Sequence, residues 1–238
     1  MEVTSLYREP ERQEQLEFGA LEYHDVFKIF HSGPAETVAL RGLELRIEPG
    51  EIVGLFGPSG SGKTTALLLA AGLDEPSAGE VRVFGQPLGR LDDAQLAHYR
   101  ARRVGIVFQS RNLWPLLSAR DNVELAVRLG GRRRDVTRQV DQALDVMGLR
   151  GRAGVRAGSL SGGEQQRVAI AAAAARAAPL LLADEPTAEL DERNEESVLA
   201  AFRRLRETFG ATVVIVTHSP RVADAVDRVL ELRDGSLA

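Results

Sequence analysis

The 238-residue sequence contains no cysteine. A disulfide framework, a zinc site with cysteine ligands and a thiol nucleophile are therefore excluded. Lysine is almost as scarce, because Lys28 and Lys63 are the only two lysines among 30 basic residues. The net charge of −4 argues against bulk, non-specific nucleic-acid binding, so no nucleic-acid partner is expected. A chain of this length can bury most of its apolar surface in one or two domains.

Long apolar runs are also missing. Residues 168–183 form the most apolar stretch, but Arg176 and Pro179 interrupt it, and a membrane span needs about 20 predominantly apolar residues. Residues 1–19 carry five glutamates and no apolar segment of the kind found in signal peptides. We therefore expect a charged N-terminal tail and a soluble, intracellular protein. Any function at a membrane requires a second chain that supplies the span.

Apolar strand patterns alternate with helical patterns along most of the chain. This alternation predicts an α/β fold with a parallel sheet covered on both faces, interrupted by a mostly helical insertion. Asp121 and Asp135 stand where each could cap a helix of that insertion. Strands are expected at residues 20–30, 37–47, 51–56, 80–84, 104–108, 180–183, 212–216 and 228–232. Helices are expected at residues 63–71, 121–129, 135–147 and 194–209.

A glycine-rich loop follows the strand expected at 51–56 and precedes the helix expected at 63–71. Residues 57–64, GPSGSGKT, match the phosphate-loop pattern GxxxxGK[ST]. Its backbone N–H groups can surround phosphate oxygens, Lys63 can reach the β- and γ-phosphates, and the Thr64 hydroxyl can bind Mg²⁺. The cofactors expected are ATP and Mg²⁺. The candidate nucleotide-binding residues in this region are Gly57, Pro58, Ser59, Gly60, Ser61, Gly62, Lys63, Thr64 and Thr65.

Polar side chains follow two of the buried strands. Asp184 and Glu185 end the strand at 180–183, and His218 follows the strand at 212–216. Ligands of open α/β sheets bind at the carboxyl ends of strands. Because neighbouring strand residues point to opposite sides, one of these two carboxylates could orient Mg²⁺ while the other polarises the attacking water. His218 could contact the γ-phosphate, or it could be an ordinary hydrogen-bonded loop histidine.

Residues 160–167, LSGGEQQR, point to a family. With the phosphate loop before this segment and Asp184–Glu185 after it, the chain resembles ATP-binding-cassette (ABC) ATPases over about residues 20–235. The resemblance implies a P-loop NTPase fold with a RecA-like core, a small antiparallel β region and an inserted helical subdomain. The core would comprise about 20–90 and 178–235, the helical subdomain about 91–177, and residues 1–19 the tail.

The resemblance also implies roles for single residues. Glu185 is similar to the general base and His218 to the switch histidine, while Thr64, Gln109 and Asp184 correspond to the residues around Mg²⁺. Phe30 stands where the family has an aromatic that stacks on adenine; the alternative is that Phe30 is an ordinary apolar strand residue. Asp191 belongs to a segment that resembles the D-loop. Four residues would contact ATP bound to another subunit, namely Ser161, Gly162, Gly163 and Glu164.

Residues 107–123 and 163–187 resemble the lipoprotein-release and macrolide-export branch (LolD, MacB and FtsE-like). The sequence differs from the residues usual in that branch at 172–174 and at 188–189. It also has Ser219 at a position where aspartate is common. In this branch the ATPase meets a transmembrane permease. The corresponding coupling surface would comprise Arg111, Asn112, Leu113, Trp114 and Leu116. Ordinary core packing of its apolar residues is the alternative. The arginines at 132–134 suit a solvated loop or, alternatively, contact with anionic lipid.

The resulting hypothesis is an ATP-binding and ATP-hydrolysing subunit that energises a membrane ABC transporter. It would work as a dimer with two sandwiched ATP molecules, expected to be a homodimer, and would lie on the inner face of the cell membrane through its permease. One alternative is an FtsE-like regulatory or mechanotransmission ATPase. The other, a soluble ABC ATPase acting on DNA or ribosomes, is disfavoured because the interval between the phosphate loop and LSGGE holds only about 100 residues and neither a cysteine nor a second cassette is present.

Overall fold

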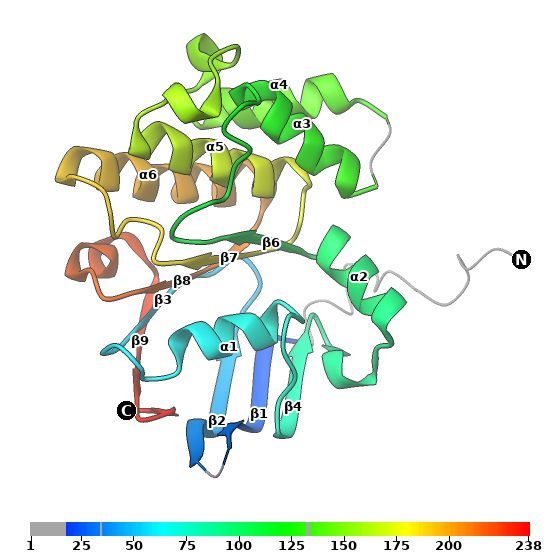
Figure 1. Cartoon of the computed structure of the whole chain (residues 1–238), viewed down its shortest axis with the longest axis vertical. Helices are drawn as coiled ribbons and strands as arrows, with labels where there is room; N and C mark the ends of the chain where they lie inside the picture. The colour runs from blue at the N-terminus through cyan, green and yellow to red at the C-terminus, as the bar shows by residue number, and fades with distance from the viewer. Residues whose placement is uncertain (1–17, 34, 132–133) are drawn as a thin grey trace, which may run out of the picture.

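The computed structural model describes residues 18–33, 35–131 and 134–238. The expected tail at 1–19 and the arginines at 132–134 therefore lie largely outside the described residues. Figure 1 shows a layered molecule in which a central sheet separates an upper group of helices from α1 (Lys63–Ala70). A second, smaller sheet lies on the far side of α1. The α/β class predicted from the sequence is thus observed.

The central sheet has six strands in the order β10-β9-β3-β8-β7-β6. All neighbouring pairs are parallel except β9 with the C-terminal β10. β3, β7 and β8 are buried along almost their whole length and are mostly apolar, as expected for parallel strands that are covered on both faces. The strands are β3 (Ile52–Phe56), β6 (Val104–Val107), β7 (Leu180–Asp184), β8 (Thr212–Thr217), β9 (Arg228–Arg233) and β10 (Ser236–Leu237).

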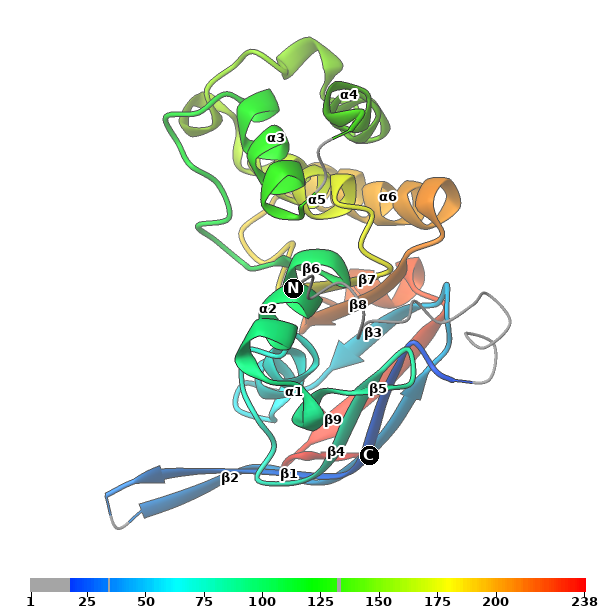
Figure 2. The ribbon, with the colours of Figure 1, turned by 90° about the vertical axis from the view of Figure 1, so that its right-hand side faces the viewer.

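The smaller sheet is antiparallel, in the order β2-β1-β4-β5. Its strands are β1 (Leu21–Ser32), β2 (Ala35–Ile47), β4 (Ala78–Val83) and β5 (Gln86–Pro87). The hairpin of β1 and β2 extends well beyond the body of the molecule (Figure 2). This sheet is the small antiparallel region that the family resemblance implies.

Five further α-helices lie in the described part of the chain, and three of them begin with a capping box in which the cap side chain and the third helical residue exchange hydrogen bonds. They are α2 (Asp93–Arg102), α3 (Ala119–Leu129), α4 (Val136–Val146), α5 (Gly162–Ala175) and α6 (Glu192–Phe209). The caps of α3 and α4 differ from expectation. Ser118 caps α3 and Asp121 is its third residue, while Asp135 precedes α4 with a left-handed backbone and no side-chain cap bond.

The segment at 91–177, expected to be a helical subdomain, also encloses β6. This strand pairs in parallel with β7 at the edge of the central sheet. Strand β6 is therefore part of the core sheet, whereas α3, α4 and α5 pack on one another above it. The strand predicted at 104–108 is thus present, and the chain leaves the core sheet only after it.

Alternate residues of the central strands pack into two apolar cores, one on each face of the sheet. Val213 and Ile215 of β8 face the cluster formed with α3 to α6, whereas Val214 and Val216 face the cluster formed with α1 and the smaller sheet. This alternation follows from the twofold side-chain period of a strand. The parallel pairing of β8 with β3 and with β7 places the carboxyl ends of the three strands beside one another.

Phe202 lies in the upper core and is only 1% exposed. We expect Phe202→Ala to lower the free energy of unfolding by about 3–5 kcal/mol, because it removes buried contacts and leaves a cavity. Urea unfolding of the two proteins measures the difference. Phe209→Ala is the matched control, because Phe209 is only partly buried on the same helix. Equal losses for the two variants would contradict this packing.

Within the described residues, no helix combines the length and the apolarity that a membrane crossing requires. The longest helix, α6, has 18 residues and carries charged side chains along much of its length.

Candidate nucleotide site

The loop between β3 and α1 depends on two of its glycines. At Gly57, φ is +152° and a Cβ atom would lie 2.2 Å from the Leu232 carbonyl oxygen. At Gly62, φ is +101° and a Cβ atom would lie 2.4 Å from the Ala39 carbonyl oxygen. Side chains at these positions would be strained and would collide with β9 and β2. The loop is therefore held in one conformation by the strands on either side of it.

Lys63 begins α1 and is 7% exposed. Its Nζ donates hydrogen bonds to the carbonyl oxygens of Gly57 (2.8 Å) and Pro58 (2.9 Å). The ammonium group is thus enclosed by the loop. The positive end of α1 adds to its charge at the same place, which makes the loop suited to an anion.

A cavity of about 600 Å³ opens over this loop, a volume within the range of small-molecule sites. Phe30 is not among the described residues that line it; the ring is 43% exposed, with the Lys28 Nζ 4.9 Å from its centroid. The lining residues are Ala39, Ser59, Gly60, Ser61, Gly62, Lys63, Thr64, Thr65, Gln109, Glu185, Ala188 and His218.

Thr64 lines the cavity and contacts Asp184, which is not among the described residues that line it. The Thr64 hydroxyl donates to Asp184 Oδ1 at 3.2 Å. Burial raises the pKa of Asp184, the hydrogen bond from Thr64 lowers it, and the neighbouring Glu185 charge raises it again. A bound cation would reverse this destabilisation of the carboxylate.

These residues fit Mg²⁺, which is bound through one or two oxygen side chains together with substrate phosphates and water. Among the described residues there is no cluster of three or more acidic or histidine side chains that could hold a metal without such help. Two buried oxygens at the site, Ser61 Oγ and Glu185 Oε2, have no hydrogen-bond partner in the described structure. Buried polar atoms are normally paired, so these oxygens indicate where bound groups complete the site.

Glu185 and His218 are in direct contact. His218 Nδ1 lies 2.8 Å from Glu185 Oε1. The Glu185 backbone N–H donates to the Val216 carbonyl at 2.8 Å, and its φ of +46° is a left-handed conformation that is uncommon for residues other than glycine. The side chain of Glu185 is 18% exposed and that of His218 is 69% exposed. A sheltered carboxylate is thus oriented by an accessible imidazole.

Gln109 reaches the same cavity from the turn after β6. Its Nε2 donates to Glu189 Oε1 at 3.3 Å. The buried Gln166 of α5 donates to the Phe108 carbonyl beside it, also at 3.3 Å. The turn that carries Gln109 therefore contacts both α5 and the segment after β7. Asp191, at the end of that segment, accepts a hydrogen bond from the Asn194 N–H and caps α6.

The Ser161–Glu164 segment begins α5 and does not line the phosphate cavity. Ser161 caps α5: its Oγ accepts from the Glu164 N–H at 3.3 Å, and its N–H donates to Glu164 Oε2 at 3.0 Å. These bonds and Arg152 lower the pKa of Glu164. None of the four residues 161–164 is among the described residues that line the phosphate cavity. Gly162 instead lines a smaller neighbouring cavity of about 170 Å³ together with Gln109 and Glu185. Within one chain the segment therefore borders the site but does not line the phosphate cavity.

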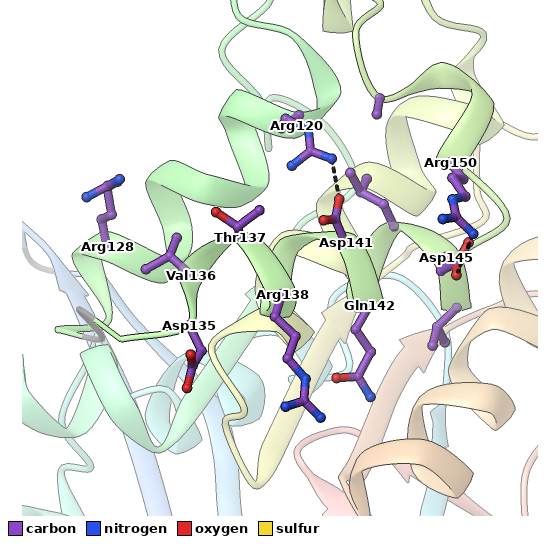
Figure 3. Close-up of a pocket in the computed structure, with 13 residues that line it drawn as sticks. Arg120, Arg128, Asp135, Val136, Thr137, Arg138, Asp141, Gln142, Asp145 and Arg150 are labelled. Atoms are coloured by element: carbon purple, nitrogen blue, oxygen red, sulfur yellow. Dashed lines mark hydrogen bonds and ion pairs between the residues drawn. The ribbon is translucent and has the colours of Figure 1, made fainter.

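A larger hollow, of about 1190 Å³, lies over α3 and α4 (Figure 3). Arg120 and Arg150, which line it, are paired with Asp141 and Asp145. No phosphate loop is among the described residues that line this hollow. Gln139 Oε1 of α4 is a buried oxygen without a partner in the described structure, but Gln139 does not line the hollow. The smaller cavity, over the phosphate loop, is therefore the better candidate for the nucleotide site.

A strand, a glycine loop and a helix, with carboxylates at the end of a neighbouring strand, define a P-loop nucleotide-hydrolysing protein. The sequence pattern of the ABC transporter family matches residues 40–188, and the chain belongs to this family as an ATP-hydrolysing ATPase. The resemblance drawn from the LSGGE segment and the predicted P-loop fold are thereby confirmed.

Relatives match over nearly the whole chain. An uncharacterized ABC transporter ATP-binding protein from Thermotoga maritima is 42% identical, over 91% of this chain and 93% of the relative. The lipoprotein-releasing system ATP-binding protein LolD of Anaeromyxobacter dehalogenans is 43% identical, over 91% and 92%. The macrolide export ATP-binding/permease protein MacB of Chromobacterium violaceum is 43% identical over 91% of this chain. The chain spans only 34% of that MacB protein.

Solved structures agree. A dimeric ATP-binding cassette in a post-hydrolysis state with ADP and Pi aligns with a TM-score of 0.82 and 38% identity, over 91% of this chain and 96% of the other. The cbiO1 protein of Clostridium perfringens, part of the transporter complex cbiONQ, aligns with a TM-score of 0.84 and 26% identity, over 93% and 87%.

Proposed function

We propose that two copies of this chain form a dimer that sandwiches two ATP molecules and drives a membrane permease. One observation carries the proposal. The cavity over the phosphate loop is lined by residues 59–65, Gln109, Glu185, Ala188 and His218 but by none of residues 161–164. The Ser161 cap thus presents a helix N-terminus, a favourable place for an anion, outside its own phosphate cavity. A second copy would supply that helix end to the open side of the cavity.

Within one half-site, the loop residues 57–65 would surround the phosphates. Lys63 would exchange its bonds to the Gly57 and Pro58 carbonyls for phosphate oxygens. Thr64 and Asp184, already in contact, would hold Mg²⁺ with Gln109 nearby. Phe30, exposed on the β1–β2 hairpin, would stack on the adenine.

Glu185 would act as the general base. A base must lie within hydrogen-bond reach of the water that it activates, and the Glu185 carboxylate faces the cavity from the end of β7. His218 would orient this carboxylate through the 2.8 Å contact. Once the γ-phosphate has left, the charge that bridges the two copies decreases, and the dimer would open.

The permease surface would lie on the loop before α3. Trp114 is 65% exposed and Leu116 is 80% exposed, while Leu113 packs against the upper core. Asn122, which is 5% exposed, fixes this loop: its Nδ2 donates to the Trp114 carbonyl (3.1 Å) and the Ser118 carbonyl (2.9 Å), and its Oδ1 accepts from the Trp114 N–H (2.8 Å). A rigid loop that exposes large apolar side chains is typical of an interface. The protein would then be peripheral on the cytoplasmic face of a membrane.

Co-purification from native membranes tests the partner. The wild-type chain should recover a membrane protein that contains transmembrane helices. We expect the double variant Trp114→Ser, Leu116→Ser to recover at least about tenfold less of it, since interface anchors of this kind contribute 2 kcal/mol or more. Leu129→Ser is the matched control, because Leu129 is an equally exposed leucine (73%) at the far end of α3. Recovery of only soluble partners by the wild-type chain would overturn the proposal.

A further inference from the structure

Helix α6 contains a buried glutamate. Glu195 is 7% exposed, although it lies in the first turn of an amphipathic helix whose other acidic residues face solvent. Charged side chains are rarely this buried without partners. The helical pattern of α6 therefore does not by itself explain why the Glu195 carboxylate is buried.

The reason is visible in its contacts. Glu195 Oε1 accepts hydrogen bonds from the Ser219 hydroxyl at 2.6 Å and from the Thr187 hydroxyl at 3.1 Å. Its Oε2 lies 3.9 Å from Arg221 Nε. An ionised carboxylate only accepts hydrogen bonds, so both hydroxyls must donate to it. Bonds of this charge-assisted kind are stronger than those between neutral groups.

The two hydroxyls belong to the two segments that carry Glu185 and His218. Thr187 is two residues after Glu185, at the end of β7, and Ser219 directly follows His218, at the end of β8. Glu185 and His218 touch each other on the cavity side. Glu195 ties the same two segments together on the opposite side, against α6.

We propose that Glu195 is a positioning residue that holds His218 in register with Glu185 by anchoring Ser219 and Thr187 to α6. The inference rests on the roles proposed for Glu185 and His218. Without the carboxylate, Ser219 loses its hydrogen bond to α6, while the bonds from Arg203 to the Asp224 and Ala225 carbonyls farther along the segment remain. The imidazole next to Ser219 can then turn away from Glu185. Small misplacements of catalytic groups lower turnover far more than they lower binding.

The first experiment measures kcat and KM for ATP. We expect Glu195→Ala to lower kcat by about tenfold, with KM changed less than about twofold, since the phosphate loop is untouched. Glu195→Gln keeps an acceptor oxygen and should recover most of the loss. Glu192→Ala is the matched control: Glu192 lies in the same helical turn and pairs with the same Arg221, but it is 80% exposed and forms no hydrogen bond with Thr187 or Ser219 in the described structure. Its kcat should equal that of the wild type.

A double-mutant cycle with His218→Ala distinguishes positioning from general support of the fold. If Glu195 acts through His218, Glu195→Ala should change kcat less than about twofold in the His218→Ala background. A full tenfold loss in that background would overturn the inference, as would an unchanged kcat for Glu195→Ala with only a lowered melting temperature.

Two further variants keep the test decisive. If Glu195→Ala does not fold, Ser219→Ala removes one of the two hydrogen bonds from a surface segment and should still lower kcat; a wild-type kcat would then overturn the inference. Glu185→Gln distinguishes a failure of the role proposed for Glu195 from a failure of the proposed site. Its inactivity together with a wild-type kcat for Glu195→Ala overturns only the role of Glu195, whereas its full activity overturns the proposed site as well.

Discussion

Lys63→Ala is expected to lower ATP turnover by at least about 100-fold, because it removes a preorganised positive charge from the place where the phosphates bind. The ammonium group is 7% exposed and is already held by two loop carbonyls, so its position costs little reorganisation when a nucleotide arrives. Steady-state hydrolysis and equilibrium binding of ATP to the purified protein measure the two effects separately.

Lys63→Arg is the informative companion variant. It keeps the positive charge but replaces a compact ammonium by a planar guanidinium, which the space between the Gly57 and Pro58 carbonyls does not suit. We therefore expect a large loss from this variant too. A melting temperature close to that of the wild type would show that the loop still folds. Turnover by Lys63→Ala within about threefold of the wild type would contradict the assigned site.

Glu185→Gln is expected to lower turnover by about 100-fold or more and to leave ATP bound. Glutamine has nearly the same shape and can still meet His218 Nδ1, which lies 2.8 Å from Oε1 in the wild type, but it cannot take a proton from water. The ATP-bound dimer should then accumulate. Size-exclusion chromatography in Mg²⁺-ATP detects it as a species of twice the mass.

Glu192→Gln serves as the control for this experiment. It makes the same chemical change at a side chain that is 80% exposed and far less constrained, so it should hydrolyse ATP and elute like the wild type. A Glu185→Gln protein that remains monomeric in Mg²⁺-ATP and hydrolyses it at the wild-type rate would show that another group is the base.

Local sequence patterns correctly predicted the elements that are determined by residues close together in the chain. The strand at 51–56, the glycine loop and the helix from Lys63 are consecutive in the chain, and the P-loop spacing fixes their geometry. The apolar runs of β7 and β8 likewise identified the strands that carry Asp184, Glu185 and His218. Chemistry at the ends of buried strands is therefore readable from the sequence.

Features that depend on distant contacts were not predicted. Asp121 and Ser118 are both acceptable caps, and Ser118 caps α3 while its segment also bonds back to residues 153–157. The sequence patterns predicted no role for Glu195. Only the packing of α6 against the ends of β7 and β8 brings it to Thr187 and Ser219. Sequence spacing carries no signal for such a three-segment contact.

The backbone of Glu185 has a left-handed φ of +46°, and its Oε2 is buried without a partner in the described structure. Strain of this kind costs about 1–3 kcal/mol and persists only where surrounding contacts impose it. The proposed general base therefore combines an unfavourable backbone conformation with a buried, unpaired oxygen. A ligand that pairs with this oxygen would raise the free energy of unfolding, so the melting temperature becomes a gauge of site occupancy. Selection for thermostability alone would favour replacing Glu185, trading activity for stability.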